Sequence, residues 1–341
     1  MEILKIGDAK SQVFVGETYL NLAEYLPKNK QIIVIADDNI LKNYGDFFLK
    51  WSSVINFTAN ERLKTLKSAS RIYRLLLKLK ADRNSFIVAV GGGIVCDVAG
   101  YAASTFMRGI PFGFVSTTLL SQVDASVGGK NGLNLFGYKN MIGTFTQPQF
   151  VICDTKMLNT LPEREFIAGF AEIVKAALIR NAELFDYIEQ NAEKAVARNP
   201  EVIRHLVVES VKIKAEIVAM DEREQGIRRI LNFGHTFGHA IEGLTGISHG
   251  EAVSIGMMIA ARRSVDTAGL KESSYERLKQ LLLRLGLPVA TDAQPEALLN
   301  FLQNDKKREG DDIHFVMLNE IGKAIVCKTP IKKLNEFLEM H

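Results

Sequence analysis

The segment Ser85-Phe-Ile-Val-Ala-Val-Gly-Gly-Gly-Ile-Val-Cys-Asp97 joins a run of apolar residues to a glycine-rich turn. A continuous apolar run of this length is typical of a strand buried on both faces, as in a parallel sheet. Similar runs occupy residues 31–37, 112–116 and 149–154, and helical patterns such as residues 63–79 lie between them. This alternation of strands and helices predicts a doubly wound α/β domain.

The glycines that follow this run admit two interpretations. Glycine lets a backbone approach a phosphate closely, and a helix N-terminus favours anions, so Gly91, Gly92 and Gly93 suit a dinucleotide. The spacing is not G-x-G-x-x-G, however, and three glycines after a strand also suit a simple turn. Asp37, at the end of the first run, has the same ambiguity: it can accept hydrogen bonds from a ribose hydroxyl or cap the next helix.

The densest polar stretch covers residues 116–143. One interpretation is a long, glycine-rich surface loop. Long segments without regular structure are uncommon inside compact domains, however, and are often functional. Lys130 and Lys139 lie in this stretch among glycines and small polar residues, which suits contact with an anionic ligand.

The second half of the chain is predicted to be mainly helical. Apolar residues recur at helical spacing over residues 163–180, 183–198, 201–220 and 253–268. Near the end, apolar runs at 313–318 and 324–327 flank a turn-like Asn319-Glu-Ile-Gly322, which indicates a small hairpin. We therefore predict an α/β domain over residues 1–157 and a helical domain over residues 158–341.

Three of the six histidines fall between residues 235 and 249. His235 and His239 are four residues apart, so they share a face of a helix. An isolated pair is more simply explained as surface or hydrogen-bonded core histidines, but three in so short a stretch favour a metal site.

A carboxylate completes this predicted metal site. Glu172 lies in an otherwise apolar helical pattern, with Lys175 three residues later. An exposed ion pair is one interpretation of this spacing, although the apolar neighbours disfavour it. The other is that Glu172 joins His235 and His249 in a His₂Glu set, which leaves a coordination position open for substrate.

Composition argues against several classes of protein. The chain has 42 Lys and Arg against 39 Asp and Glu, with no long basic run, so no nucleic acid is expected as a partner. No membrane span or signal peptide is expected, because no stretch of about 18 apolar residues occurs and the start lacks a basic and apolar pattern. Cys96, Cys153 and Cys327 match no metal or disulfide spacing, which favours a reducing cytosol.

Basic residues recur near these features, namely Lys175, Lys214, Arg228, Lys306 and Lys307. Each alone is more simply explained as a solvated side chain. If they cluster in space, they indicate a substrate with several negative groups, such as a phosphate and a carboxylate.

Seven motifs follow one another along nearly the whole chain: Gly91-Gly-Gly-Ile-Val-Cys-Asp97, Thr117-Thr-Leu-Leu-Ser-Gln-Val-Asp-Ala-Ser-Val-Gly-Gly-Lys130, Lys139-Asn-Met-Ile-Gly143, Gly169-Phe-Ala-Glu-Ile-Val-Lys175, Arg228-Arg-Ile-Leu-Asn-Phe-Gly-His-Thr-Phe-Gly-His239, His249-Gly-Glu251 and Asp305-Lys-Lys307. Together they resemble the 3-dehydroquinate synthase family, although several are shared with other sugar-phosphate cyclases.

The resemblance implies a Rossmann-like N-terminal domain that binds NAD, a mainly α-helical C-terminal domain that binds Zn²⁺ or Co²⁺, and a cytoplasmic homodimer. It implies conversion of 3-deoxy-D-arabino-heptulosonate 7-phosphate to 3-dehydroquinate and phosphate, in the shikimate route to aromatic amino acids. The steps it implies are transient oxidation by NAD, β-elimination, reduction, ring opening and intramolecular aldol closure.

The resemblance also assigns site residues. Zinc would be held by Glu172, His235 and His249. NAD would be bound by Asp37, Asn39, Glu61, Lys64, Gly91, Gly92, Gly93, Ile94, Val95, Cys96, Asp97, Thr117, Thr118, Lys130, Lys139, Met157, Leu158, Asn159 and Thr160. The substrate would be surrounded by Arg108, Asp124, Lys130, Asn140, Lys175, Lys214, Arg228, Asn232, His239 and one of Lys306 or Lys307. His239 thus becomes a substrate residue rather than a metal ligand.

Some residues depart from those frequent in the family, namely Asn60, Cys96, Asn131 and Leu135. These departures bear on loop conformation and cofactor affinity, because none removes a metal ligand or a charged substrate contact.

Other functions compete with this one. The first is another sugar-phosphate cyclase that acts on a different phosphorylated sugar, and the second is a metal- and NAD-dependent polyol dehydrogenase. The substrate of the shikimate route is favoured over other sugars by the presence together of Lys214, Arg228, Asn232 and His239. A non-enzymatic NAD-binding protein would have no use for a complete metal set.

Overall fold

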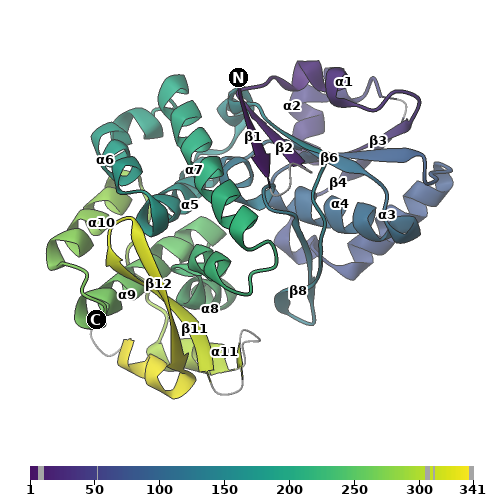
Figure 1. Cartoon of the computed structure of the whole chain (residues 1–341). Coiled ribbons are helices and arrows are strands. Elements are labelled where there is room, and N and C mark those ends of the chain that lie inside the picture. The colour runs from purple at the N-terminus through teal and green to yellow at the C-terminus, as the bar shows by residue number, and fades with distance from the viewer. Residues whose placement is uncertain (7–10, 52, 304–307, 310–311, 338–341) are drawn as a thin grey trace. The chain divides into compact units, whose positions relative to one another are not determined.

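The computed structural model describes residues 1–6, 11–51, 53–303, 308–309 and 312–337 (Figure 1). The chain divides into two compact units. The first unit comprises Met1–Pro162 with Lys214–Ala219, and the second comprises Glu163–Ile213 with Met220–His341. The boundary between the units therefore lies five residues after the predicted boundary at residue 157. The short helical segment Lys214–Ala219 also belongs to the first unit, although it lies in the predicted helical domain.

The described part of the first unit is built on a seven-stranded sheet in the order β1-β2-β9-β6-β5-β3-β4. Its strands are β1 (Glu2–Ile6), β2 (Ser11–Val15), β3 (Gln31–Asp37), β4 (Val54–Phe57), β5 (Ser85–Gly91), β6 (Phe112–Ser116) and β9 (Phe150–Cys153). β1 pairs with β2 in antiparallel fashion, and the other neighbours are parallel. The four apolar runs predicted as strands are confirmed as β3, β5, β6 and β9.

Helices cover both faces of this sheet, as a doubly wound domain requires (Figure 1). They are α1 (Leu22–Tyr25), α2 (Asp38–Phe48), α3 (Leu66–Lys78) and α4 (Gly93–Thr105). α2 packs against β3 and β4, whereas α3 and α4 pack against each other, with α4 against β5 and β6. The predicted doubly wound α/β fold is thus confirmed.

The polar stretch at residues 116–143 is not a long surface loop, so that interpretation is wrong. It contains a π-helical turn (Ser121–Ala125) and an antiparallel hairpin of β7 (Lys130–Leu135) and β8 (Tyr138–Phe145). The glycines gave the appearance of a loop because several of them occupy positive-φ turns, including Gly128, Gly129 and Gly137.

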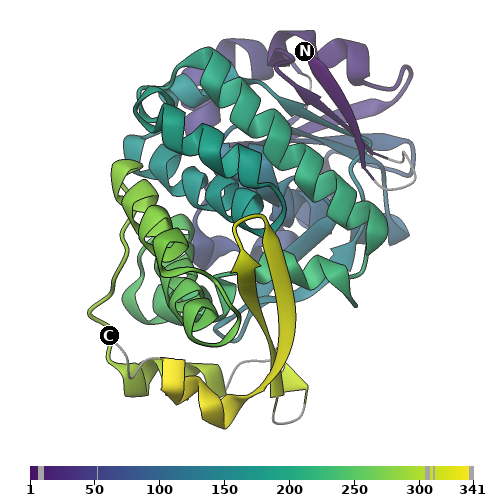
Figure 2. The ribbon, with the colours of Figure 1, turned by 60° about the vertical axis from the view of Figure 1, so that its left-hand side comes forward.

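The second unit is mainly helical, and the four predicted helices and the terminal hairpin are confirmed in it (Figure 2). Its helices are α5 (Glu163–Arg180), α6 (Ala182–Val196), α7 (Pro200–Met220, of which Lys214–Ala219 count with the first unit), α8 (His235–Thr245), α9 (His249–Thr267), α10 (Glu272–Arg284) and α11 (Pro295–Gln303). Its small sheet has β10 (Arg308–Glu309), β11 (Asp312–Glu320) and β12 (Lys323–Pro330). β11 packs on α9 and β12 packs on α5.

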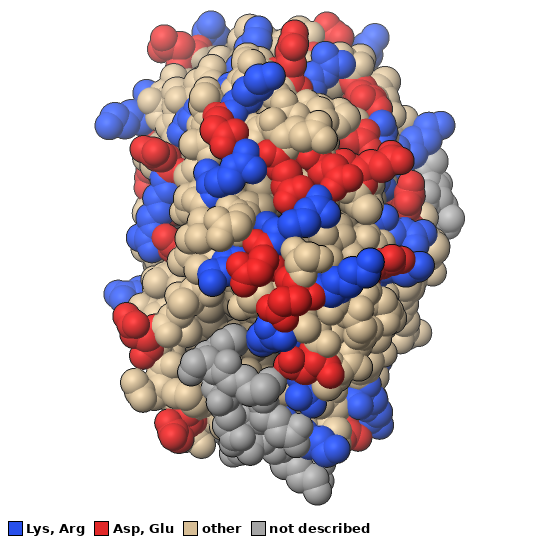
Figure 3. All heavy atoms as spheres, turned by 90° about the vertical axis from the view of Figure 1, so that its left-hand side faces the viewer, with Lys and Arg blue, Asp and Glu red and all other residues tan. Residues whose placement is uncertain are grey.

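Charged residues of both signs are interspersed on the face shown in Figure 3. Two ion pairs join α10 to α6: Arg277 with Asp186 at 2.6 Å, and Arg284 with Glu193 at 2.9 Å. Among the described residues, none of the helices is long and apolar enough to cross a membrane.

Phe86 tests the packing of the first unit. Its ring is fully buried and stacks on that of Phe150, with 5.9 Å between the centroids. We expect Phe86→Ala to lower the free energy of unfolding by about 3–5 kcal/mol in urea denaturation, because the lost ring leaves a cavity. Leu77→Ala, at an exposed position on α3, is the control and should change it by about 0.5 kcal/mol or less. Equal effects of the two substitutions would contradict the packing described here.

Candidate active site

Glu172, His235 and His249 converge within the second unit. One ligand atom from each lies within 4.8 Å of the others. The Nε2 atoms of His235 and His249 are 3.6 and 3.5 Å from Glu172 Oε1. The three residues predicted to bind a metal are therefore brought together, although they are widely separated in the sequence.

Local structure explains why the two histidines face Glu172. His235 and His249 are the first residues of α8 and α9. A capping box between Ser248 and Glu251 fixes the start of α9, since each side chain accepts a hydrogen bond from the other's backbone N–H. Glu251 also forms a two-point ion pair with Arg164, near the start of α5, so the helix carrying His249 is tied to the helix carrying Glu172.

The electrostatics of the cluster favour a cation. Glu172 and Lys175 are 2% and 3% exposed and form an ion pair, so the exposed-pair interpretation is wrong. Burial raises the pKa of the Glu172 carboxyl, but the Lys175 ammonium and the His249 imidazole outweigh burial and lower that pKa below its usual range. Within the described part of the chain, neither carboxylate oxygen has a hydrogen-bond partner of good geometry. An ionised, buried carboxylate facing two imidazoles fits a divalent metal ion.

His239 stands apart from these three residues. Its ring centroid is 5.3 Å from that of His235 and 6.0 Å from that of His249, and its side chain is partly exposed. The residue is therefore close to the cluster without belonging to the group whose ligand atoms converge. The resemblance implies different roles for the two histidines, with His235 at the metal and His239 at the substrate, and this position of His239 is compatible with that prediction.

In the first unit, two of the predicted cofactor residues, Asp37 and Gly91, lie at the point where strand order reverses. In the sheet, β4 lies beside β3 on one side and β5 lies beside β3 on the other, so the chain changes direction across the sheet after β4. Asp37 ends β3 and Gly91 ends β5, and the residues before them, Ala36 and Val90, are paired. Ligands of doubly wound sheets bind in the crevice at such a reversal.

The glycine turn leaves a helix N-terminus without a side-chain cap. Gly92 is the N-cap of α4 and has no side chain to accept from the first-turn N–H groups, which suits a phosphate. The glycines are also needed for packing, because a Cβ on Gly92 would lie 2.8 Å from Thr118 Cγ2. Asp37 accepts a 2.7 Å hydrogen bond from Asn39 N–H and so caps α2, as the second interpretation expected. Its contact with a ribose stays a prediction.

A polar network links the other predicted cofactor residues. Lys64, which is buried, forms an ion pair with Asp97 and donates a 2.6 Å hydrogen bond to Asn140 Oδ1. Lys139 lies 3.6 Å from Glu61. The sequence reasoning missed Asn134, which donates to Glu61 Oε1 at 2.8 Å and accepts from Asn140 N–H at 2.9 Å. Its place in the Lys130–Asn140 stretch was the signal that could have found it.

The predicted substrate residues occupy varied surroundings. Lys214 donates to the carbonyl oxygen of Asp124 at 2.6 Å and to its Oδ1 at 2.5 Å, and both residues count with the first unit. Arg228 is buried and donates to the Glu222 carbonyl oxygen, and Asn232 donates to Glu224. Lys130, Asn140 and Arg108 are exposed. Lys306 and Lys307 lie outside the described residues.

The remaining cofactor predictions lie on α4, after β6 and in a 3₁₀ helix (Thr155–Thr160). Met157 and Leu158 are buried in this 3₁₀ helix, whereas Asn159 and Thr160 are exposed. Thr160 Oγ1 lies 2.9 Å from the Tyr44 hydroxyl. The four predicted residues of this 3₁₀ helix therefore divide between the core and the surface.

Three of the four residues that differ from those frequent in the family have a structural explanation. Cys96 is buried in α4, and burial raises the pKa of its thiol, so it is a packing residue. Asn131 packs against Gly100, which has no room for a Cβ there. Asn60 caps the 3₁₀ turn Glu61–Leu63 by accepting from Arg62 N–H at 2.9 Å. Nothing in the structure explains Leu135.

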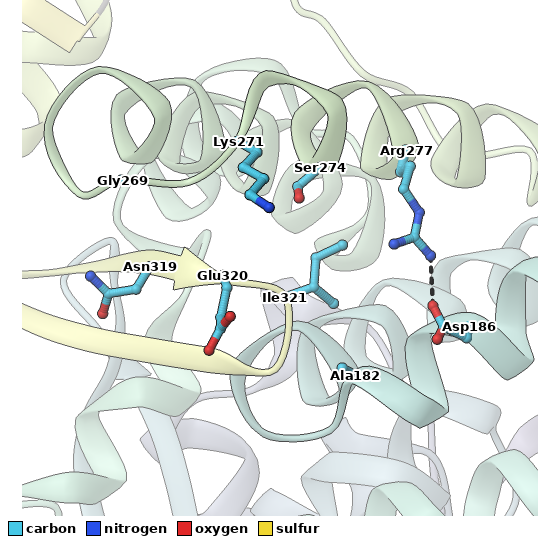
Figure 4. A pocket seen from close by; sticks show the side chains of 9 residues that line it. All are labelled: Ala182, Asp186, Gly269, Lys271, Ser274, Arg277, Asn319, Glu320 and Ile321. Carbon is cyan, nitrogen blue, oxygen red and sulfur yellow. Dashed lines mark hydrogen bonds and ion pairs between the residues drawn. The ribbon is translucent and has the colours of Figure 1, made fainter.

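A pocket of about 380 Å³ opens elsewhere in the second unit (Figure 4). Residues of α6, α10 and the β11–β12 turn line it, and Arg277 points toward Asp186 within it. None of the predicted site residues that the structure describes lines this pocket, so it is separate from the metal cluster.

Comparison with known proteins identifies the family. The model of the 3-dehydroquinate synthase N-terminal domain matches residues 54–168, and that of the C-terminal domain matches residues 169–308. The chain is 42% identical to 3-dehydroquinate synthase of Halorhodospira halophila, over 95% of this chain and 94% of the relative. It is 41% identical to that of Idiomarina loihiensis, over 96% and 95%.

Solved structures agree with this family. One is a 2-deoxy-scyllo-inosose synthase complexed with carbaglucose-6-phosphate, NAD⁺ and Co²⁺, with a TM-score of 0.87, 29% identity and 98% of both chains covered. Another is a 2-epi-5-epi-valiolone synthase from Streptomyces hygroscopicus with NAD⁺ and Zn²⁺, with a TM-score of 0.89, 25% identity and coverage of 99% of this chain and 98% of that one. An iron-containing alcohol dehydrogenase shares the fold at a TM-score of 0.67 and 18% identity. This chain belongs to the 3-dehydroquinate synthase family.

Proposed function

We propose that the chain converts 3-deoxy-D-arabino-heptulosonate 7-phosphate to 3-dehydroquinate and phosphate. The observation that carries the proposal is the convergence of Glu172, His235 and His249 in a chain 42% identical to a 3-dehydroquinate synthase over nearly its full length. This activity would place the chain in the shikimate route to aromatic amino acids.

The residues present fit both cofactors. Glu172, His235 and His249 would hold Zn²⁺ or Co²⁺, and the turn after β5 with the N-terminus of α4 would hold the NAD pyrophosphate. When bound, the metal would polarise a substrate hydroxyl and NAD would accept and return a hydride. The structures of two related cyclases that hold NAD⁺ with Co²⁺ or Zn²⁺ support this assignment.

The chain's own residues bind and orient the substrate in this proposal. Its phosphate and carboxylate need fixed positive charge, which Lys130, Lys175 and Arg228 would supply. The contact with Asp124 holds Lys214 in one orientation, so its ammonium is preorganised. Holding a single conformer is the main requirement, because elimination and ring closure occur within one molecule.

The other proposed substrate contacts complete the polar surround. They are Arg108, Asn140, Asn232, His239 and one of Lys306 or Lys307. Lys64 would position Asn140 through its 2.6 Å hydrogen bond, so a residue assigned to NAD also orders a residue assigned to the substrate.

Two alternatives receive less support. Polyol dehydrogenase activity rests on the fold alone, since the alcohol dehydrogenase neighbour is 18% identical. A different sugar-phosphate cyclase activity would fit the two solved cyclases, but these are 29% and 25% identical, against 42% and 41% for two 3-dehydroquinate synthases.

We also propose that the chain forms a homodimer in the cytoplasm. The β7–β8 hairpin exposes Phe136, Tyr138, Met141 and Phe145, and the Phe136 side chain is 89% exposed. A group of exposed apolar side chains on one hairpin is typical of a protein interface. The three cysteines are free, which suits a reducing compartment.

One assay tests the reaction. Purified chain is incubated with the heptulosonate phosphate, catalytic NAD and Zn²⁺, and phosphate and dehydroquinate are measured. Equal amounts of both products, without net NADH, are expected. Absence of both products from folded, metal-loaded protein would refute the proposal, and steady NADH formation with glycerol would indicate a dehydrogenase.

His249→Ala is expected to remove both bound metal and activity, because it deletes one of three ligands. Metal content is measured by atomic absorption after gel filtration. His205→Ala removes a histidine whose ring packs on Tyr187 and that does not belong to the converging group, so this control should keep its metal. Full metal content in the His249 variant would remove this residue from the ligand set.

Lys130→Ala is expected to give folded, metal-loaded protein whose kcat falls about a hundred-fold or more, because one fixed charge at the substrate is lost. Lys78→Ala, an exposed lysine on α3, should keep normal turnover. Normal kcat in the Lys130 variant would exclude Lys130 from the site.

Phe136→Asp is expected to shift the mass measured by light scattering from dimer toward monomer, because the new carboxylate would be desolvated in an apolar interface. Leu77→Asp, exposed on another element, should leave the mass unchanged. A monomeric wild-type chain would refute the dimer. A Phe136→Asp variant that remains dimeric would place the interface elsewhere.

A further inference from the structure

The imidazole of His249 lies between two carboxylates. Its Nε2 is 3.5 Å from Glu172 Oε1, and its Nδ1 is 3.2 Å from Glu242 Oε2. Glu242 belongs to α8, seven residues before His249, and its side chain is 10% exposed. It is one of the carboxylates that the sequence patterns and the resemblance left without a role.

His235 shows the same arrangement with a different partner. Its Nδ1 lies 3.2 Å from the Phe233 carbonyl oxygen, and its Nε2 faces Glu172. Carbonyl and carboxylate oxygens can only accept hydrogen bonds, so in a neutral ring that binds a metal Nδ1 would carry the proton and donate it to these oxygens. Nε2 is then the atom of each ring that can bind a metal beside Glu172.

We propose that Glu242 is the positioning residue for His249: it holds Nδ1–H and so fixes the ring with Nε2 toward the metal. This inference rests on the metal site of the proposed function. Glu242 is not a ligand in this proposal, since it acts through His249. A carboxylate behind a metal-binding histidine orients the ring and increases its strength as a ligand.

The two histidines differ in how their orientation can be lost. The Phe233 carbonyl belongs to the backbone, so a side-chain substitution leaves it in place. The partner of His249 is a side chain, and His249 begins its helix, with the Gly246–Ser248 segment between it and α8. A substitution at Glu242 therefore frees the His249 ring to rotate while both ring nitrogens and all three ligands remain present.

Metal affinity tests the proposal without substrate or NAD. Metal-free chain is titrated with Co²⁺ against a competing chelator, and the visible spectrum of bound Co²⁺ is recorded. Glu242→Ala should weaken the Kd about 10- to 100-fold and alter the Co²⁺ band intensities. Glu242→Gln should weaken it less, because its amide oxygen can still accept from Nδ1–H.

Glu189→Gln is the matched control. It also removes a paired carboxylate from the second unit, but its partner is Arg277 on α10. This variant should bind Co²⁺ with unchanged affinity and spectrum. Melting of each metal-free variant, followed by circular dichroism, separates a loss of positioning from a loss of folding.

The outcomes are distinct. Weaker binding by both Glu242 variants, with metal-free melting temperatures close to that of the unchanged chain, supports the proposal. An unchanged Kd and spectrum in folded Glu242→Ala, or in Glu242→Leu if the alanine variant does not fold, would overturn it, because neither side chain can accept from Nδ1–H. If the wild-type chain makes dehydroquinate while the Glu242 variants keep wild-type Co²⁺ affinity, this inference alone is refuted. If the wild-type chain has no Co²⁺ affinity, the metal site itself is refuted.

Discussion

The buried ion pair of Glu172 and Lys175 is the interaction on which the site in the second unit depends. Removing a carboxylate and an ammonium from water costs several kcal/mol for each ion, and their attraction offsets this only when the geometry is good. Lys175 keeps Glu172 ionised in an otherwise apolar helix. A charge held in this way would supply a metal ligand that does not need solvent to stay deprotonated, and His235 and His249 would complete the set.

Close helix packing places those histidines within reach of Glu172. A Cβ on Gly250 would collide with the Ala168 carbonyl group of α5, so α9 can approach α5 closely only with glycine there. Gly256 on α9 likewise leaves room for the Gly234 carbonyl oxygen just before α8. Gly234 also has a φ of 78°, a conformation that favours glycine. The positions of the ligands are thus set by steric constraints several residues away from them.

The fold alone does not distinguish a cyclase from a dehydrogenase. The chain has structural neighbours of both kinds, at TM-scores of 0.87 and 0.67 for two of them. The difference lies in the side chains, because a phosphorylated acid requires fixed cations that a simple polyol does not. In the proposed function, buried Lys175 and Arg228 and the oriented Lys214 would supply such charges.

Several elements were predictable because their signals are local. The strands at residues 31–37, 85–91 and 112–116 are continuous apolar runs, and helix α5 shows strong helical spacing. Strands β1, β2 and β4 were missed. β1, at one edge of the sheet, alternates partly buried and exposed residues over its first four positions, so it shows no continuous apolar run. The hairpin after Lys130 was mistaken for a possible loop, because its pairing depends on contacts that glycine-rich composition does not reveal.

The sequence by itself determined the element types, the family motifs and the three metal-ligand candidates, because these follow from residue chemistry and short-range periodicity. Tertiary structure decided the convergence of Glu172, His235 and His249, because only helix packing brings residues so far apart in the sequence within 4.8 Å of one another. It also decided the roles of Asn134 and Glu242. Their hydrogen bonds reach partners six or more residues away, and the folded backbone sets those distances.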